Sequence, residues 1–275
     1  MNKFIDYNWW KYIFDKRYLK TYIDFYSVER TKKEEKFIVK IIEKFFPHRS
    51  FKNIKILDCG CGYGRLTLPL AEKGFKITGL DYSKYLLSIA KKKAKELNLE
   101  NIRFIRQDMR NFYLKNEYHV ILSIFTSFGY FLNKEDDIKV LKNFYKSLKR
   151  GGCLILDLEN PIRIISSFIN NGSIDKKGFL FYSFKNKLSN NLDVLTKVTF
   201  NHQLLGIILE REWFENKKRY SYKAFFRLYY LEEILNYLKL IGFNIYRVYG
   251  NFDSKRYNEE SSPRIIVVAY RNGKS

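Results

Sequence analysis

The first 47 residues contain two segments whose apolar spacing predicts helices. Between Glu29 and Phe46, apolar residues recur with helical spacing and form one stripe, and Pro47 ends the segment. Residues 1–28 are dense in Trp, Tyr and Phe and predict one or two short helices with an aromatic face. Such an arm normally packs on the body of a protein, and it indicates a binding site only where the body has an open cleft to cover.

From residue 54 to residue 159, short apolar runs alternate with longer amphipathic runs. The apolar runs predict strands, and the amphipathic runs predict helices that end at glycines. The predicted strands are 54–59, 75–81, 101–108, 118–125 and 153–159, and the predicted helices are 65–73, 83–97 and 134–148. Strands that alternate with helices favour a parallel sheet with helices on both faces.

The rhythm changes after Pro161 and later returns. Residues 178–228 hold apolar and aromatic runs separated by polar turns, which predicts three or four antiparallel strands. A predicted helix over 231–241 and predicted strands over 243–250 and 264–271 follow. We therefore expect an α/β fold, a Rossmann-like, doubly wound, mostly parallel seven-stranded sheet with an antiparallel insertion after its fifth strand.

This pattern divides the chain into three parts. We expect an N-terminal aromatic helical arm, a Rossmann-like domain made of two segments, and an inserted antiparallel lid or substrate subdomain. Their bounds are 1–28 for the arm, 29–161 and 229–275 for the Rossmann-like domain, and 162–228 for the insertion.

Composition and charge add a possible partner and a compartment. The 275 residues include 51 Lys and Arg against 29 Asp and Glu, a net charge of +22, which could attract RNA. Basic residues occur in every segment, however, and the abundance of Lys, Ile, Asn, Tyr and Phe is typical of an AT-rich genome, so nucleic acid is not favoured.

Three cysteines make no disulfide framework, charges interrupt the N-terminus, and no apolar run approaches the ~20 residues of a membrane helix. We expect a cytoplasmic protein without membrane association.

Glycines gather directly after the first predicted strand. Residues 57–64 are LDCGCGYG, and Gly60, Gly62 and Gly64 allow a sharp turn and close approach of the backbone to a ligand. The turn lies at the carboxyl edge of the predicted sheet, where open α/β sheets bind their ligands. Cys59 and Cys61 form a C-x-C pair, but zinc needs four ligands and no histidine shares a motif with them, so we expect no metal.

Three carboxylates lie at the ends of three of the predicted strands. Asp58 precedes the glycine turn and suits a cationic ammonium or sulfonium, whereas Asp81 can accept two hydrogen bonds from ribose hydroxyls. Asp108 suits the exocyclic amine of adenine. Each acid alone could equally be a cap or loop residue, but those alternatives do not predict the joint spacing.

A nicotinamide dinucleotide is the competing ligand. Its fingerprint is G-x-G-x-x-G, whereas this turn is G-x-G-x-G with Arg65 in place of the third glycine. Asp58 is also unfavourable beside a pyrophosphate. The glycine spacing therefore disfavours an oxidoreductase.

The pattern resembles the class I S-adenosylmethionine-dependent methyltransferases over roughly residues 30–160. The motifs LDCGCGYG, TGLDYS, RQDM and LKRGGCLILDL occur here in the order of that family. The resemblance implies S-adenosylmethionine as cofactor, S-adenosylhomocysteine as product, and transfer of the methyl group by in-line displacement. The cofactor-binding residues that it implies are Asp58, Cys59, Gly60, Gly62 and Gly64 at the methionine part, Asp81 at the ribose, Tyr82, Asp108 and Met109 at the adenine, and Phe125 near the methionine amine.

The absence of a family motif narrows the class of methyl acceptor. Family members that act on exocyclic amines of nucleic acids or on glutamine usually carry an Asn/Asp-Pro-Pro-aromatic turn after the fourth strand, where this chain has SIFTSFGYF. The chain is instead similar to the small-molecule N- or O-methyltransferase branch, in which an arm and an insertion cover the acceptor. The residues expected on the acceptor side are Tyr130 and Ser127 as catalytic residues and Tyr18, Tyr22, Phe128, Arg227 and Tyr229 as binding residues. Arg227 with Tyr229 could clamp an anionic acceptor, although a plain surface arginine is an equal alternative. An RNA or protein methyltransferase and a non-catalytic cofactor-binding homologue remain the other hypotheses.

Overall fold

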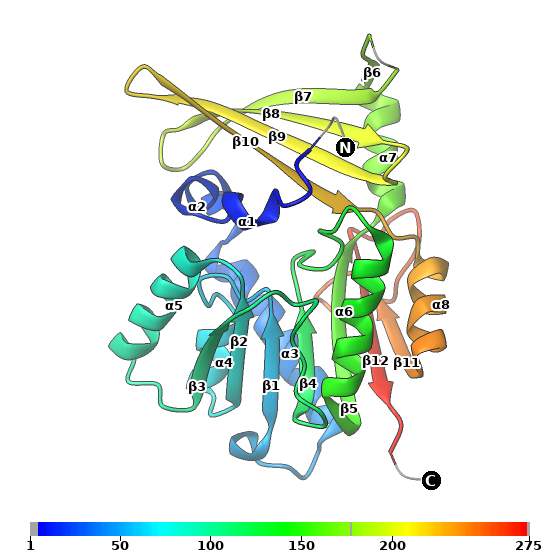
Figure 1. Cartoon of the computed structure of the whole chain (residues 1–275). Helices are drawn as coiled ribbons and strands as arrows, with labels where there is room; N and C mark the ends of the chain where they lie inside the picture. Colours follow the sequence, from blue (N-terminus) through cyan, green and yellow to red (C-terminus); the bar gives the residue numbers. More distant parts are fainter. Residues whose placement is uncertain (1–4, 177, 274–275) are drawn as a thin grey trace.

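The described residues form two β-sheets and their flanking helices, and the N-terminal helices lie between the sheets (Figure 1). The computed structural model describes residues 5–176 and 178–273. The larger sheet has seven strands and forms the body, and the smaller sheet has five. None of the helices within the described ranges is long and apolar enough to cross a membrane.

The seven-stranded sheet confirms the predicted doubly wound α/β fold. Its strand order is β11-β12-β5-β4-β1-β2-β3, and β12 runs antiparallel to both of its neighbours while the other six strands run in one direction. The strands are β1 (Lys55–Cys59), β2 (Lys76–Asp81), β3 (Ile102–Arg106), β4 (Tyr118–Ser123), β5 (Leu148–Glu159), β11 (Phe243–Tyr249) and β12 (Arg264–Arg271). The carboxyl ends of the parallel strands point toward the arm and the second sheet, as Figure 1 shows.

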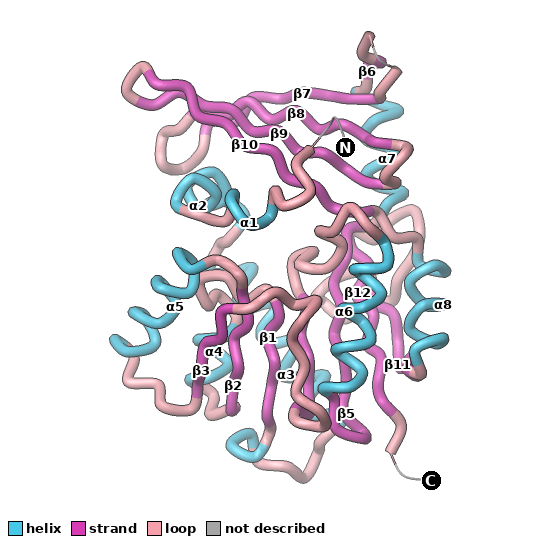
Figure 2. Tube along the Cα trace, viewed as in Figure 1, coloured by secondary structure: helices cyan, strands magenta, loops and turns pink. Residues whose placement is uncertain are grey.

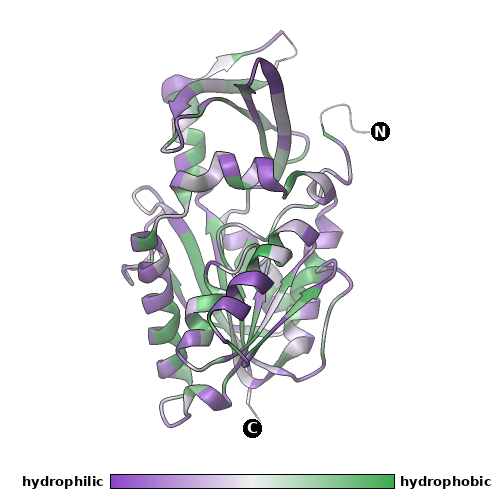
Figure 3. Cartoon of the chain, turned by 90° about the vertical axis from the view of Figure 1, so that its left-hand side faces the viewer, coloured by the Kyte–Doolittle hydropathy of each residue, from purple (hydrophilic) through white to green (hydrophobic). Residues whose placement is uncertain are grey.

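Helices cover both faces of this sheet, as predicted. Helices α3 (Val28–Phe45) and α4 (Thr67–Glu72) bury their apolar stripes on one face, and α6 (Lys134–Ser147) and α8 (Leu231–Ile241) on the other. Helix α5 (Lys84–Glu96) contacts β2 and β3, and the Ser83 hydroxyl caps it by accepting a 3.0 Å hydrogen bond from the Leu86 amide. Figure 3 shows apolar strands enclosed by helices whose outer faces are polar.

The second sheet is antiparallel throughout and has the order β10-β9-β8-β7-β6. Its strands are β6 (Ser173–Ile174), β7 (Leu180–Lys187), β8 (Asp193–Asn201), β9 (Gly206–Glu215) and β10 (Lys218–Arg227). The four long strands match the predicted block. Helix α7 (Pro161–Asn171) leads from β5 into this sheet (Figure 2), and the apolar pattern did not predict it. The Asn160 side chain caps α7 and Pro161 occupies its first turn, a start signal that the sequence does contain.

The N-terminal arm forms α1 (Trp10–Ile13), α2 (Lys16–Tyr22) and a 3-10 turn, η1 (Ile23–Phe25). It lies between the carboxyl edge of the large sheet and the second sheet (Figure 1). The Thr21 hydroxyl is 2.8 Å from the hydroxyl of Tyr222 on β10, which joins the arm to the second sheet. The arm therefore contacts the second sheet as well as the body (Figure 1).

Candidate functional site

The glycine turn after β1 requires glycine for two physical reasons. Gly60, Gly62 and Gly64 have φ angles of +80°, +55° and +86°, a region that residues with a Cβ atom rarely adopt. A Cβ atom on Gly60 would also lie 2.6 Å from the Cβ atom of Ser127. The turn after β1 therefore packs directly against the turn after β4.

Asp81, at the end of β2, fixes the glycine turn from the side. Its Oδ2 accepts a 2.9 Å hydrogen bond from the Gly62 amide and its Oδ1 a 2.8 Å hydrogen bond from the Ser83 amide. Burial raises the pKa of Asp81, and these backbone hydrogen bonds act in the opposite direction. Each carboxylate oxygen has a second lone pair, so Asp81 can still accept hydrogen bonds from a ligand.

Asp58 is a buried carboxylate beneath the same turn. The Thr67 hydroxyl donates a 2.5 Å hydrogen bond to Oδ2. Burial raises the pKa of Asp58 to about 6, against the opposing effects of the Thr67 hydrogen bond and the charge of Arg65. A carboxylate with this pKa favours a cationic ligand group, because such a group stabilises its ionised form.

A buried ion-pair cluster that sequence reasoning did not assign lies beside the turn. Glu34 on α3 is fully buried and pairs with Arg65 at 2.6 Å and with Arg30 at 2.7 Å. The Arg30 guanidinium also lies 4.6 Å from the centre of the Phe125 ring. The cluster connects α3, the glycine turn and the turn after β4. The signal was present in the sequence, since Arg65 replaces the third glycine of a dinucleotide fingerprint.

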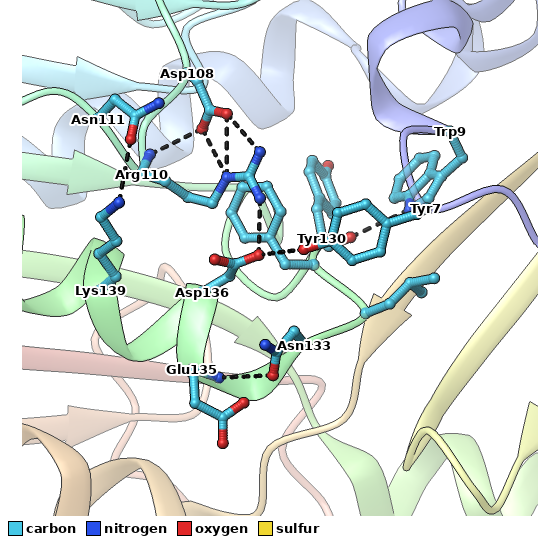
Figure 4. Close-up of polar contacts among 12 residues, drawn as sticks. Tyr7, Trp9, Asp108, Arg110, Asn111, Tyr130, Asn133, Glu135, Asp136 and Lys139 are labelled. Atoms are coloured by element: carbon cyan, nitrogen blue, oxygen red, sulfur yellow. Dashed lines mark hydrogen bonds and ion pairs between the residues drawn. The ribbon is translucent and has the colours of Figure 1, made fainter. Parts of the chain in front are cut away.

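Asp108 follows β3, and Arg110 already binds the carboxylate that was predicted to contact adenine. Arg110 donates hydrogen bonds of 3.1 Å from Nε and 2.7 Å from Nη2 to its Oδ2, and reaches Asp136 on α6 through Nη1 at 2.7 Å (Figure 4). The Tyr7 hydroxyl donates a 2.8 Å hydrogen bond to the same Asp136 oxygen. Asp108 thus belongs to a chain of contacts that reaches the N-terminal arm.

Two cavities lie between these elements. The first is lined by the ends of β1 to β4 and by the arm. The second lies between the arm, α3, α7 and the second sheet. Both cavities are lined by Phe14, Tyr18, Phe125 and Tyr130. These four aromatic residues form the boundary between the two cavities.

Most of the predicted cofactor residues line the first cavity. They are Asp58, Gly60, Gly62, Asp81, Tyr82, Asp108, Met109 and Phe125, and the predicted catalytic residues Ser127 and Tyr130 line it as well. Cys59 and Gly64 belong to the turn but are not among the lining residues. On the acceptor side, Tyr18 lines both cavities and Tyr22 lines the second.

The structure does not bring Arg227, Tyr229 and Phe128 to either cavity. Arg227 donates hydrogen bonds to the carbonyls of Leu204 and Leu132, at 2.5 and 2.8 Å, and the Tyr229 hydroxyl donates one of 2.8 Å to buried Asp137. The Phe128 ring packs on Tyr229, with 5.4 Å between the ring centres. The expected anion clamp is therefore replaced by a structural junction between the second sheet and the start of α6.

Comparisons with known proteins agree with this architecture. Residues 56–152 match a methyltransferase domain family, and residues 16–92 match the carnosine N-methyltransferase family. YqeM of Bacillus subtilis, a protein named as a methyltransferase, is 28% identical over 237 residues, which cover 85% of this chain and 89% of the relative.

Solved structures share the fold over nearly the whole chain. An S-adenosylmethionine-dependent methyltransferase from Clostridium acetobutylicum superposes with a TM-score of 0.77 at 22% identity, covering 94% of this chain and 100% of the other. CalS10, an amino pentose methyltransferase from Micromonospora echinaspora solved with S-adenosylmethionine, gives a TM-score of 0.64 at 17% identity over 94% and 98% of the two chains. Residues 56–152 thus resemble a methyltransferase domain, and nearly the whole chain shares the fold of S-adenosylmethionine-dependent methyltransferases.

Proposed function

We propose that this protein methylates a nitrogen atom of a small metabolite. The observation that carries the proposal is the meeting of two cavities at Phe14, Tyr18, Phe125 and Tyr130. A methyl donor in the first cavity and an acceptor in the second would approach each other across this boundary. The arm, residues 1–28, and the insertion, residues 162–228, would then serve as the cover of the acceptor, as the sequence predicts.

The residues of the first cavity fit S-adenosylmethionine. Asp58 would bind its ammonium, and Arg65, which lines the same cavity and pairs with Glu34, would bind its carboxylate. Asp81 would accept hydrogen bonds from the ribose, and Tyr82 and Met109 would contact the adenine, with Asp108 beside it. When bound, this cofactor supplies a methyl group on a positively charged sulfur.

The boundary residues favour nitrogen over oxygen as the acceptor atom. Phe14, Tyr18, Phe125 and Tyr130 include no histidine and no carboxylate. Burial raises the pKa of Tyr130 and of Tyr18 far above the usual tyrosine value, so both phenols stay neutral and neither accepts a proton. A hydroxyl acceptor needs a base, whereas an amine can lose its proton to water before it binds. The match to the carnosine N-methyltransferase family, which covers residues 16–92 and so the second half of the arm and the glycine turn, supports the same choice.

Ser127 has no role toward the acceptor in this scheme. Its hydroxyl donates a 2.8 Å hydrogen bond to the Ile124 carbonyl, and its side chain packs on Gly60. Catalysis would rest on alignment of the two reactants and exclusion of water by the aromatic boundary. Positioning of this kind contributes up to about 7–11 kcal/mol in favourable cases.

The decisive experiment offers the purified protein S-adenosylmethionine and paired acceptors that differ only in an amino or a hydroxyl group. We expect S-adenosylhomocysteine to form with some small amines and not with their hydroxyl partners. Turnover of the alcohols instead would refute nitrogen transfer. Methylation of RNA that declines steeply with salt would favour the polyanion alternative suggested by the +22 charge.

A further inference from the structure

Arg211 occupies an inward-facing position of the second sheet that is otherwise apolar. Along β9, Ile207, Leu209, Arg211 and Trp213 share one face, because side chains alternate along a strand. Ile207, Leu209 and Arg211 line the second cavity. Only 5% of the surface of Arg211 is exposed. A charge is costly at such a position unless a partner compensates it.

The contacts of Arg211 hold its guanidinium but do not neutralise it. Nη1 donates a hydrogen bond to the Thr21 carbonyl, and the group lies over the Tyr22 ring, 4.0 Å from its centre. Nε is buried and has no hydrogen-bond partner among the described residues. Nε and Nη2 form the side-on edge of a guanidinium, the edge that binds carboxylate or phosphate with two parallel hydrogen bonds. The Nε donor on this side-on edge is therefore unused, whereas Nη1 binds Thr21.

The acids that line the second cavity are already paired with other cations. Glu34 is paired with Arg30 and Arg65, and Glu159 with Arg264. Tyr222, the neighbour of Arg211 on β10, also contacts the guanidinium through its hydroxyl. Burial nevertheless raises the pKa of this phenol, so Tyr222 provides no negative charge. Within residues 5–176 and 178–273, Arg211 thus makes no ion pair, and a ligand remains as the source of the missing negative charge.

We propose that Arg211 binds an anionic group, a carboxylate or a phosphate, of the methyl acceptor. The proposal rests on the proposed function, since it takes the second cavity as the acceptor site. The acceptor would then be an amine that also carries an acid group. The anionic group would be held against β9 while the nitrogen reaches the aromatic boundary at Tyr18 and Tyr130. The anion clamp that the sequence suggested at Arg227 would exist on the neighbouring strand instead.

The test measures anion binding by calorimetry on protein saturated with S-adenosylhomocysteine. The probes are acetate, glutarate, inorganic phosphate and pyrophosphate, each compared with chloride at equal ionic strength. We expect wild-type protein to bind one class, carboxylate or phosphate, more tightly than chloride, and the class that binds identifies the anion. Arg211→Gln should weaken that binding at least tenfold, and Arg211→Lys should weaken it less.

Arg219→Gln is the matched control, because it removes the same charge from the second sheet at an exposed residue paired with Glu212. It should bind the anions like wild type. Equal binding by wild type and folded Arg211→Gln, or no preference of wild type over chloride, would overturn the proposal. Should Arg211→Gln fail to fold, Arg211→Lys provides the test. It should bind the anion more weakly than wild type, because lysine lacks the two parallel donors, and an unchanged affinity would overturn the proposal. Binding of S-adenosylhomocysteine depends on the first cavity. If wild-type protein does not bind S-adenosylhomocysteine, that result refutes the proposed function instead.

Discussion

The Phe125 amide donates a 2.7 Å hydrogen bond to Oδ2 of Asp157 while Phe125 adopts a φ angle of +60°. Thr126 follows with a φ of +56°, so two consecutive residues occupy the left-handed region at the end of β4. Arg264 on β12 donates a 2.8 Å hydrogen bond to the other Asp157 oxygen and a 2.7 Å hydrogen bond to the Thr126 hydroxyl. Asp157 and Arg264 thus hold a strained turn that presents Phe125 to both cavities. Strain of this kind persists only where its surroundings enforce it.

Asp157→Asn should therefore destabilise the protein and weaken cofactor binding together. Asp157 is fully buried, and its replacement leaves Arg264 without its full countercharge and turns an amide hydrogen toward a donor. Breaking a buried pair of this kind costs about 3–5 kcal/mol. Denaturant unfolding measures the loss of stability, and calorimetry with S-adenosylhomocysteine measures the loss of affinity.

Asp193→Asn provides the comparison. Asp193 pairs with Lys185 at 3.3 Å on an exposed part of the second sheet, where ion pairs contribute about 0–1 kcal/mol. A loss in Asp157→Asn no larger than in Asp193→Asn would show that the turn after β4 does not depend on Asp157.

Gly60→Ala should disrupt the cofactor turn, whereas Gly74→Ala should not. Both glycines have positive φ angles, +80° and +95°, so alanine is strained by about 1–2 kcal/mol at either position. Only at Gly60 does the new Cβ atom collide, 2.6 Å from Ser127, while nothing lies within 4 Å at Gly74. We expect both variants to lose stability in thermal unfolding and only Gly60→Ala to lose affinity for S-adenosylhomocysteine.

A second substitution separates the collision from the backbone strain. Adding Ser127→Gly to Gly60→Ala removes the atoms that collide and should restore part of the affinity. If the double variant binds no better than Gly60→Ala, the close packing of the two turns does not determine cofactor binding.

The sequence predicted the body of the fold because its signals are local. Apolar periodicity and glycine stops located nearly every strand and helix of the large sheet, and parallel strands bring Asp58, Asp81 and Asp108 to one edge. Helix α7 was missed although Asn160 and Pro161 mark its start. Arg110, which pairs with Asp108, is only two residues away in the sequence, but no spacing rule predicts that its side chain folds back onto Asp108.

The acceptor side could not be derived in the same way because it depends on contacts between distant segments. Arg211 and Arg227 lie on neighbouring strands of the insertion, and nothing in their local sequence separates their roles. Only the tertiary structure places Arg227 against the carbonyls of Leu204 and Leu132 and Arg211 against the arm. A hint existed in the alternation Ile207, Leu209, Arg211, in which a charge takes an apolar position of the strand.

Cofactor affinity should depend on pH through Asp58. Burial raises its pKa to about 6 in the free protein, and a bound ammonium would favour the ionised carboxylate and lower that pKa. Affinity for S-adenosylhomocysteine should therefore be constant above about pH 6 and fall as the pH drops below it, by up to about tenfold for each pH unit. Calorimetry across this range measures the effect.

Asp58→Asn supplies the control for the pH profile. The amide has nearly the shape of the carboxylate but does not titrate, so its affinity should be low at neutral pH and nearly independent of pH down to about 5. A wild-type affinity that stays constant below pH 6, or a decline that persists in Asp58→Asn, would assign the ammonium contact to another group.

Tyr130→Phe distinguishes a boundary residue from a catalytic base. Loss of a general base lowers turnover by about 10²–10⁴-fold. Burial keeps the Tyr130 phenol neutral, so removal of its hydroxyl should lower the turnover of an amine acceptor by less than about tenfold and leave cofactor affinity unchanged. Single-turnover rates measured across pH provide the test, because the loss of a base would also remove one limb of the pH profile. A loss of about 10²-fold or more with that limb missing would make Tyr130 the base and reopen oxygen as the acceptor atom.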